Sequence, residues 1–244
     1  MREAERMVNG GEMFSRSEAL LGKEAMARLA AAHVLVVGVG GVGSWCAEAL
    51  VRTGLGHITL MDDDVVAASN VNRQCPATAG TIGRTKVEVM AERLKAINPE
   101  CEVVERFERF ERFERFEGFD AVVDAIDSVD CKAELILGAT EAGVPLVSSM
   151  GAALRTDPTK VKVTWFGKVE GDGLAKALRQ RFKRLTRWPT RKFSCVWSSE
   201  QVRKLPNVPN GRMVPKGSLM PVTATFGMCL ASEAIRILTR GESK

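Results

Sequence analysis

The sequence predicts an α/β protein with a doubly wound, mostly parallel sheet of the Rossmann type and an irregular C-terminal half. Apolar runs typical of strands buried on both faces alternate with amphipathic helical segments along the 244 residues. A glycine-rich turn, Gly38-Val-Gly-Gly-Val-Gly43, follows the first apolar run and leads into a helical segment. This is the context in which such a turn binds phosphate.

Strand and helix signals recur in a regular order. The first helix is expected at residues 17–31, and the continuous apolar run at 33–37 is the first strand. Further strands are expected at 58–61, 102–105, 121–124, 145–148 and 161–165, and further helices at 44–53, 85–97, 174–187 and 220–238. Residues 1–12 are expected to form a loose tail. Residues 202–218, with three prolines and two glycines, are expected to form a mobile loop.

Residues 105–116 are four identical copies of Glu-Arg-Phe. A period of three matches neither a helix nor a strand, but it places Glu and Arg four residues apart, which stabilises helices. We therefore expect a short surface helix that buries two or three of its phenylalanines. An Arg/Phe platform for nucleic acid and a recent expansion without a function of its own are the alternatives.

Composition limits the classes of function. The net charge of +5 allows a polyanionic partner without requiring one. No two of the six cysteines are spaced C-x-x-C, so neither a zinc site nor a disulfide framework is expected. The N-terminus lacks an apolar signal segment, and polar residues interrupt the apolar stretch at 219–231. We expect that stretch to be a core helix, with no membrane span, and the protein to be cytoplasmic.

Two cations distinguish this chain from a dinucleotide-binding dehydrogenase. Such an enzyme would show the glycines and one ribose-binding acid. Here Asp62 and Asp64 follow the second expected strand, and Arg73 and Lys86 come after them. Guanidinium and ammonium groups suit phosphate oxygens. The order of these residues favours a triphosphate that is about to be cleaved over a nicotinamide.

A candidate metal ligand follows another strand. Asp127 comes just after the expected strand at 121–124, at the edge where open α/β sheets bind their ligands. Mg²⁺ in phosphate sites takes one or two carboxylates. Asp127 is therefore the main candidate ligand for Mg²⁺, and an aspartate of the run at 62–64 could assist it.

Together these motifs resemble those of the ThiF-type adenylating enzymes, relatives of the ubiquitin-activating enzymes. The residues that carry the resemblance are Gly38, Gly40, Gly41, Gly43, Asp62, Asp64, Asn70, Arg73, Gln74, Lys86, Asp124 and Asp127. The resemblance implies ATP and Mg²⁺ as cofactors, with Asp62 on the ribose and Asp127 on the metal. It assigns Asn70, Arg73 and Lys86 to the phosphates, with Gln74 in the same binding segment.

The resemblance also implies a homodimer, in which Arg16 reaches the nucleotide of the partner subunit from an N-terminal arm. We accordingly divide the chain into that arm with its helix (1–29), an ATP-binding half (30–150) and a substrate-facing half (151–244) of one domain.

Other segments resemble the tRNA threonylcarbamoyladenosine dehydratases, which use ATP to cyclise a threonylcarbamoyl group on an adenosine beside the anticodon. These segments are 124–128, 145–149, 157–159 and 196–200. Relatives that charge sulfur-carrier proteins commonly have paired C-x-x-C motifs, which this chain lacks. The chain departs from the pattern at 105–116 and near 211–220, where some members carry a cysteine. These departures weaken a sulfur-transfer partner more than the core activity.

A basic segment points independently to RNA. Between residues 174 and 199 the chain has eight basic residues, two tryptophans and no carboxylate. The basic residues are Lys176, Arg179, Arg181, Lys183, Arg184, Arg187, Arg191 and Lys192. Such a patch neutralises phosphates and is typical of nucleic-acid binding. A solvated basic helix is the alternative.

The expected activity is ATP-dependent cyclisation through an acyl-adenylate, with release of AMP and pyrophosphate. Arg16, Arg73, Lys86 and Asp127 are the expected catalytic residues. Because the second nucleophile belongs to the substrate, no catalytic cysteine is required, although Cys195 stays an alternative. Adenylation of a ubiquitin-like or sulfur-carrier tail and a regulatory module without turnover are the competing functions.

Overall fold

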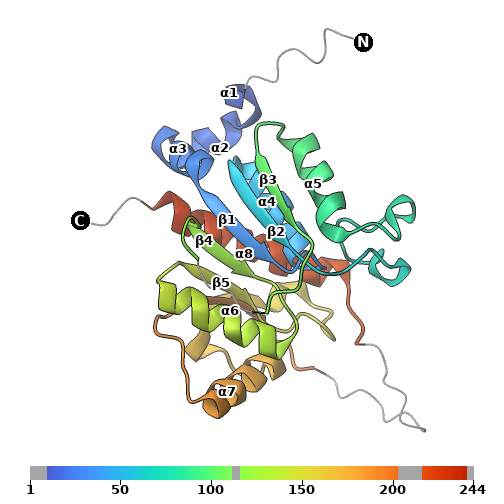
Figure 1. Cartoon of the computed structure of the whole chain (residues 1–244), viewed down its shortest axis with the longest axis vertical. Coiled ribbons are helices and arrows are strands. Elements are labelled where there is room, and N and C mark those ends of the chain that lie inside the picture. Colours follow the sequence, from blue (N-terminus) through green and yellow to red (C-terminus); the bar gives the residue numbers. More distant parts are fainter. Residues whose placement is uncertain (1–9, 112–115, 203–215, 241–244) are drawn as a thin grey trace.

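The protein has one seven-stranded sheet in a computed structural model that describes residues 10–111, 116–202 and 216–240 (Figure 1). The strands are β1 (His33–Val37), β2 (His57–Met61), β3 (Glu102–Arg106), β4 (Ala121–Asp124), β5 (Leu146–Ser149), β6 (Val161–Trp165) and β7 (Ser194–Ser198). Their order is β3-β2-β1-β4-β5-β7-β6, and only the β6–β7 pair is antiparallel. The expected fold class is confirmed.

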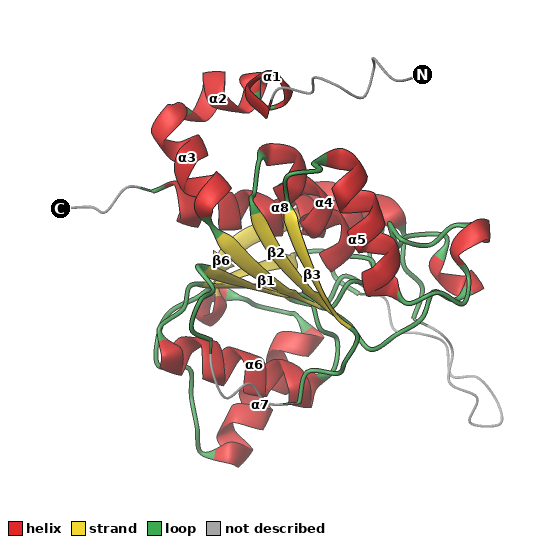
Figure 2. Ribbon diagram, turned by 45° about the horizontal axis from the view of Figure 1, so that its top comes forward, coloured by secondary structure: helices red, strands yellow, loops and turns green. Residues whose placement is uncertain are grey.

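Helices cover both faces of the sheet (Figure 2). The helices of the described residues are α1 (Gly10–Met13), α2 (Ser15–Leu21), α3 (Lys23–Ala31), α4 (Gly43–Thr53), α5 (Lys86–Ile97), α6 (Val129–Ala142), α7 (Gly173–Leu185) and α8 (Met220–Thr239). One layer contains α4, α5 and α8, and the other contains α6 and α7. This two-sided cover is why β1 is apolar at its last four positions and β4 at its first three.

The first strand shows how the pleat divides the core. Val34 and Val36 point into the cluster beneath α4 and α8, whereas Leu35 and Val37 point into the cluster with α6 and α7. All four are buried. Side chains alternate between the two faces of a strand, so a run of four apolar residues satisfies both layers at once.

The C-terminal helix α8 is a core helix, as expected. Val222, Phe226, Leu230 and Ala234 recur every four residues and are buried against α4 and the sheet. By length and composition alone α8 could cross a membrane, but its apolar face is occupied by the protein. A side chain at Gly227 would come within 2.5 Å of the carbonyl oxygen of Val42, so glycine permits the close approach to α4.

Several local expectations need correction. The helix expected at 17–31 is two helices, broken at Gly22, whose φ of 84° is accessible to glycine at little cost. Residues 10–12 are part of the helical turn α1 rather than a loose tail, and residues 1–9 lie outside the described chain. The strand β7 lies at the end of the basic segment, where we expected no strand. Of the loop expected at 202–218, residues 203–215 lie outside the described chain.

The Glu-Arg-Phe repeat does not form the expected helix where it is described. Its first copy begins within β3, which runs to Arg106 because that residue pairs with Met61 of β2, and residues 107–111 are irregular. Residues 112–115 lie outside the described chain. The expectation that two phenylalanines are buried is confirmed for Phe110 and Phe116, which join the cluster beneath α6.

Candidate active site

The predicted nucleotide-binding residues meet at the carboxyl edge of the sheet. The glycine loop leaves β1, Asp62 follows β2 and Asp127 follows β4, and β1 lies between the other two strands. A cavity of about 980 Å³ opens there. Its lining includes Gly38, Gly40, Gly41, Asp62, Asp64, Asn70, Arg73, Gln74, Lys86 and Asp127. Of the predicted nucleotide site, Gly43 and Arg16 do not line this cavity.

Two of the glycines are required by close backbone packing. Gly38 has a φ of 90°, and a side chain there would lie 2.7 Å from the carbonyl oxygen of Ala125. A side chain at Gly43 would lie 1.8 Å from the carbonyl oxygen of Gly38. Gly43 therefore supports the loop from beneath, at the first residue of α4, while Gly40 and Gly41 face the cavity.

Asp62 fixes the glycine loop to the end of β2. Its Oδ2 accepts a hydrogen bond of 2.6 Å from the backbone N–H of Val39, and its Oδ1 accepts one of 2.9 Å from the N–H of Asp64. Burial raises the pKa of this carboxyl group, although the charge of Lys86 and both N–H donors oppose the rise. Each oxygen keeps a lone pair that can accept a ribose hydroxyl.

Lys86 is a buried cation at the start of α5. Its ammonium nitrogen lies 2.5 Å from Oδ2 of Asp64 and 3.5 Å from Oδ1 of Asp62. The side chain of Thr85 caps the helix by accepting a hydrogen bond from the N–H of Glu88. Lys86 therefore sits between the aspartates and the cavity, where a phosphate oxygen can compete for its donors.

The turn that carries Arg73 is held by α4. The indole N–H of Trp45 donates a 2.9 Å hydrogen bond to the carbonyl oxygen of Arg73. One residue before Trp45, the hydroxyl of Ser44 accepts a 3.2 Å hydrogen bond from the N–H of Cys75. The Arg73 guanidinium stays local, donating to the carbonyl oxygen of Ser69. Helix α4 thus sets the position of the predicted phosphate-binding arginine.

Glu48, one turn further along α4, ties the same turn to α5. Its buried carboxylate accepts hydrogen bonds from Arg52, Arg93 and the thiol of Cys75. Burial alone would raise the pKa of Glu48, but the hydrogen bonds from Arg93, Cys75 and Arg52 lower it to about 2. Burial and the neighbouring carboxylate raise the pKa of Cys75 to about 12, so this thiol stays protonated.

Two amides differ in their availability for a ligand. The side-chain oxygen of Asn70 accepts a hydrogen bond from the N–H of Ala67, so Asn70 also shapes the loop. The side-chain oxygen of Gln74 is buried and has no hydrogen-bond partner among the described residues. A buried polar atom without a partner is costly unless a ligand satisfies it. Gln74 lines the cavity, where a hydroxyl or amino group of a bound nucleotide could donate a hydrogen bond to this oxygen.

The loop after β4 rests on a buried charged network that the sequence did not single out. The Lys132 ammonium lies 2.8 Å from Oδ1 of Asp124 and donates a 2.9 Å hydrogen bond to the carbonyl oxygen of Ile126. The hydroxyl of Ser148 donates to the other oxygen of Asp124. Asp124 is thus occupied within the protein. Its partner Lys132 lies in an apolar helix without an acid at helical spacing, so no local pattern reveals it.

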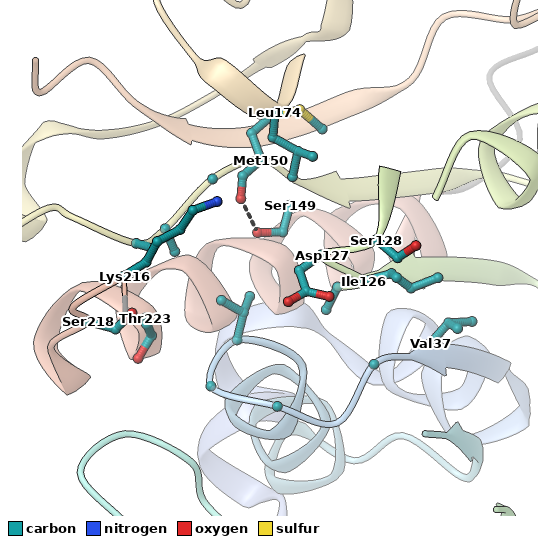
Figure 3. Close-up of a pocket in the computed structure, with 18 of the residues that line it drawn as sticks. Val37, Ile126, Asp127, Ser128, Ser149, Met150, Leu174, Lys216, Ser218 and Thr223 are labelled. Carbon is teal, nitrogen blue, oxygen red and sulfur yellow. Dashed lines mark hydrogen bonds between the residues drawn. The ribbon is translucent and has the colours of Figure 1, made fainter. Parts of the chain in front are cut away.

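Asp127 is available for a metal. It is exposed, and its carboxylate points into the cavity (Figure 3). No described residue forms an ion pair or hydrogen bond with that carboxylate. The oxygens of the other candidates, Asp62, Asp63 and Asp64, lie within 4.8 Å of one another, but Lys86 already forms ion pairs with two of them, Asp62 and Asp64. Asp127 therefore fits a Mg²⁺ ion better than the run at 62–64.

Arg16 lies at the opposite edge of the sheet. It is an exposed residue of α2, and the chain passes from α2 through α3 to the beginning of β1. The cavity lies beyond the end of β1. Arg16 therefore cannot serve the cavity of its own chain in this arrangement.

The basic segment is less uniform than its sequence suggests. Arg179 donates to the carbonyl oxygens of Phe166 and Val169, and Arg191 donates to that of Gly143. Arg181 pairs with Asp130, and Arg187 pairs with Glu134 and Glu141 of α6. Lys192 lies over the ring of Trp165. Lys176, Lys183 and Arg184 are exposed and have no ion pair with a described residue.

Cys195 does not have the setting of a nucleophile. It lies in β7 and is fully buried. Burial strongly raises the pKa of its thiol, because the charged form would lose its hydration. The six cysteines are all free thiols, and the other fully buried one, Cys46, also has a raised pKa.

The chain is similar to tRNA threonylcarbamoyladenosine dehydratases in both sequence and structure. The tRNA threonylcarbamoyladenosine dehydratase of Haemophilus influenzae is 36% identical in an alignment that covers 98% of this chain and 97% of that protein. A crystal structure of E. coli tRNA N6-threonylcarbamoyladenosine dehydratase with AMP has a TM-score of 0.85 and 39% identity, covering 95% of this chain and 96% of that one. The ATP complex of the same enzyme has a TM-score of 0.84, with the same identity and coverage.

A family model covers almost the whole chain. The model of the ThiF family matches residues 14–244, which include the glycine loop, the turn that carries Arg73 and the helix α8. Since this match extends over far more than half of the sequence, the protein belongs to the ThiF family.

Proposed function

We propose that this protein dehydrates N6-threonylcarbamoyladenosine in tRNA to its cyclic form, using ATP and releasing AMP and pyrophosphate. The observation that carries the proposal is the set around the glycine loop. Asp62 lies beside Lys86, Arg73 is held by α4, and the Gln74 oxygen has no described partner. A similar E. coli enzyme has a crystal structure in complex with ATP, which supports ATP as the nucleotide.

In the first step the threonine carboxylate of the modified base attacks the α-phosphorus of ATP. An O–P bond forms, the bond to the β-phosphate oxygen breaks, and pyrophosphate leaves. Arg73 and Lys86 contribute by holding the phosphates in line and by balancing the negative charge that develops on them. Mg²⁺ held by Asp127 would supply further charge neutralisation on the phosphate oxygens.

In the second step the neighbouring carbamoyl group attacks the activated carbonyl carbon and loses a proton, and AMP leaves. The carboxylate oxygen departs with AMP, so the base loses the elements of one water. Because the substrate supplies both nucleophiles, the protein needs no thiol. The burial of Cys195 supports this route.

The working unit of this proposal is a homodimer. Arg16 is exposed at the amino edge of the sheet, so it can reach a nucleotide only in a second copy of the chain. Exposed cations of α7, namely Lys176, Lys183 and Arg184, would contact tRNA phosphates. A tRNA substrate would place the enzyme in the cytoplasm.

Adenylation of the C-terminus of a ubiquitin-like or sulfur-carrier protein is not favoured. The H. influenzae and E. coli proteins, which this chain matches over almost their whole length, are named as tRNA-modifying enzymes. The chain also has no C-x-x-C pair.

The decisive experiment is mass spectrometry of nucleosides. The protein is incubated with tRNA that contains N6-threonylcarbamoyladenosine, with ATP and Mg²⁺, and the tRNA is then digested. We expect a nucleoside that is lighter by one water, together with AMP in equal amount. Omission of ATP and replacement of ATP by NAD are the controls. An unchanged nucleoside in the complete reaction would overturn the proposal.

A further inference from the structure

The cavity continues past the nucleotide-binding residues into a second part, which we call the acceptor lobe. We define it by Met150, Leu154, Arg155, Leu174, Ala177 and Lys216, all of which line the cavity. These residues come from the chain after β5, from the first turns of α7 and from the segment before α8. Because the lobe adjoins the glycine loop and Asp127, a group bound in it lies next to the phosphates of a nucleotide.

One wall of the acceptor lobe is fixed by a buried ion pair. The guanidinium of Arg155 donates to Oδ2 of Asp172 at 3.2 Å and to the carbonyl oxygen of Gly151 at 3.0 Å, and it also donates to the carbonyl oxygen of Glu200. Asp172 in turn caps α7 by accepting from the N–H of Ala175. Both side chains are almost fully buried. Because these two charges pair with each other, neither is available to a ligand.

The opposite wall of the lobe is formed by residues 216–218. It is hydrogen-bonded both to the first wall and to the turn that carries Arg73. Leu154 has a φ of 62°, a strained conformation for a residue with a side chain, and its N–H donates a 2.8 Å hydrogen bond to the carbonyl oxygen of Gly217. The side chain of Asn72 donates a 2.9 Å hydrogen bond to the carbonyl oxygen of Ser218. Such strain is concentrated at functional sites, where the surrounding structure maintains it.

Lys216 is the cation that this arrangement offers to a ligand. Its side chain extends across the cavity toward Met150 and Ser149, while Asp127 faces the same space (Figure 3). No described residue forms an ion pair or hydrogen bond with its ammonium. Arg73 and Lys86 belong to the nucleotide-binding part of the cavity, and Arg155 is paired with Asp172. Among the described residues of the acceptor lobe, Lys216 is therefore the cation that is available to a ligand.

The proposed reaction brings two anions together. A carboxylate must approach an α-phosphate that is already negatively charged, and like charges repel strongly in a site from which water is partly excluded. A cation on the acceptor side removes this barrier and selects an acceptor that carries a carboxylate. Met150, Leu174 and Ala177 provide an apolar surface for the aliphatic part of the acceptor.

We propose that the acceptor lobe binds the threonylcarbamoyl group and that the ammonium of Lys216 pairs with its carboxylate before adenylation. The inference rests on the proposed function and deepens it, because it identifies the group that separates substrate tRNA from tRNA without the modification. A lysine in this position could also contact a tRNA phosphate. The two sources of negative charge are separated by comparing modified with unmodified tRNA.

The test is the discrimination between the two tRNAs by wild-type protein, Lys216→Met and Lys183→Met. Binding of each tRNA is measured at one salt concentration with a non-hydrolysable ATP analogue present, and KM and kcat are measured with modified tRNA. Because a hydrogen-bonded charge contributes about tenfold or more to affinity, Lys216→Met should lose about that much affinity for modified tRNA only. Its affinity for ATP alone should change by less than about twofold, which corresponds to less than about half a kcal/mol. The reason is that Lys216 lies in the acceptor lobe and not beside the glycine loop.

Lys183→Met is the matched control, because it removes an exposed lysine of α7 that lies outside the cavity. Any loss caused by Lys183→Met should be equal for the two tRNAs. If Lys216→Met also weakens both tRNAs equally, the lysine contacts a phosphate and the inference is wrong. If Lys216→Met keeps the wild-type discrimination and KM, the inference is likewise wrong.

These failures differ from a failure of the proposed function. If the wild-type protein does not release AMP with modified tRNA, both proposals fall together. If wild type turns over and only the response of Lys216→Met departs from expectation, the proposed function stands and the assignment of Lys216 alone is rejected.

Discussion

The ammonium of Lys132 lies 2.8 Å from the Oδ1 atom of Asp124, and both side chains are fully shielded from solvent. Asp124 is the last residue of β4, and Lys132 is in the first turns of α6. The pair also binds the carbonyl oxygen of Ile126 and the hydroxyl of Ser148. It therefore fixes the start and end of the short loop that presents Asp127.

Replacing Lys132 by methionine should strongly destabilise the protein. The substitution nearly conserves shape but leaves Asp124 as an unpaired buried charge, which costs about 3 to 5 kcal/mol of unfolding free energy. Denaturant unfolding at neutral pH measures the loss. Ser148→Ala removes one neutral donor from the same carboxylate and should cost about 1 to 3 kcal/mol. Equal stability of Lys132→Met and wild type would show that the pair does not hold the loop.

Asp127→Ala should abolish AMP formation without unfolding the protein. The side chain is exposed and unpaired among the described residues, so its loss removes no packing and no internal hydrogen bond. AMP release and the melting temperature are measured side by side. Asp130→Ala is the control, because Asp130 is three residues further along and does not line the cavity. Near-normal AMP release by Asp127→Ala would exclude it as the magnesium ligand.

Reversing Lys176, Lys183 and Arg184 to glutamate should weaken tRNA binding and flatten its salt dependence. These three cations of α7 are exposed and have no described ion-pair partner, unlike Arg181 and Arg187. Loss of three phosphate contacts lowers the slope of log K against log salt by roughly 2 to 3. Lys95→Glu, on α5, is the control for a single charge reversal outside α7, and Lys183→Glu is its matched single variant on α7. An unchanged slope would mean that RNA binds elsewhere.

Arg16 should complete the active site of a partner subunit. Arg16→Ala and Asp127→Ala proteins should each be nearly inactive, and mixing them should restore activity. With random exchange about half the dimers are mixed, and each has one site that carries neither lesion. Activity should therefore approach about a quarter of wild type if, as we propose, Arg16 acts across the interface of a closed two-fold dimer. No recovery despite demonstrated exchange, or a strictly monomeric protein, would contradict this role.

The alternation of apolar runs and helices, together with the glycine turn, was sufficient to predict the α/β class and the central strands. These signals are local, because a strand buried on both faces must be apolar at consecutive positions. The order Asp62, Arg73, Lys86 and Asp127 likewise predicted a triphosphate site, and the structure places all four around one cavity. Their chemistry is carried by residue type and by position after a strand.

Local patterns failed where the decisive partner is distant in sequence. The Glu-Arg-Phe repeat has good helical ion-pair spacing, yet its first residues extend β3, because pairing with β2 and burial of Phe110 outweigh that preference. The strand β7 has polar ends, and it forms because β5 and β6 flank it.

The sequence by itself determined the fold class and the residues that suit ATP, because strand periodicity, glycine conformation and side-chain charge are properties of short segments. Only the tertiary structure decided which charges are available to a ligand. Arg155, Lys132 and five of the eight cations in the basic segment contact partners from other parts of the chain, whereas Asp127 and Lys216 face the cavity without a described partner. Whether a charge is neutralised depends on its distance from the groups that folding brings beside it. The spacing of residues along the sequence does not give that distance.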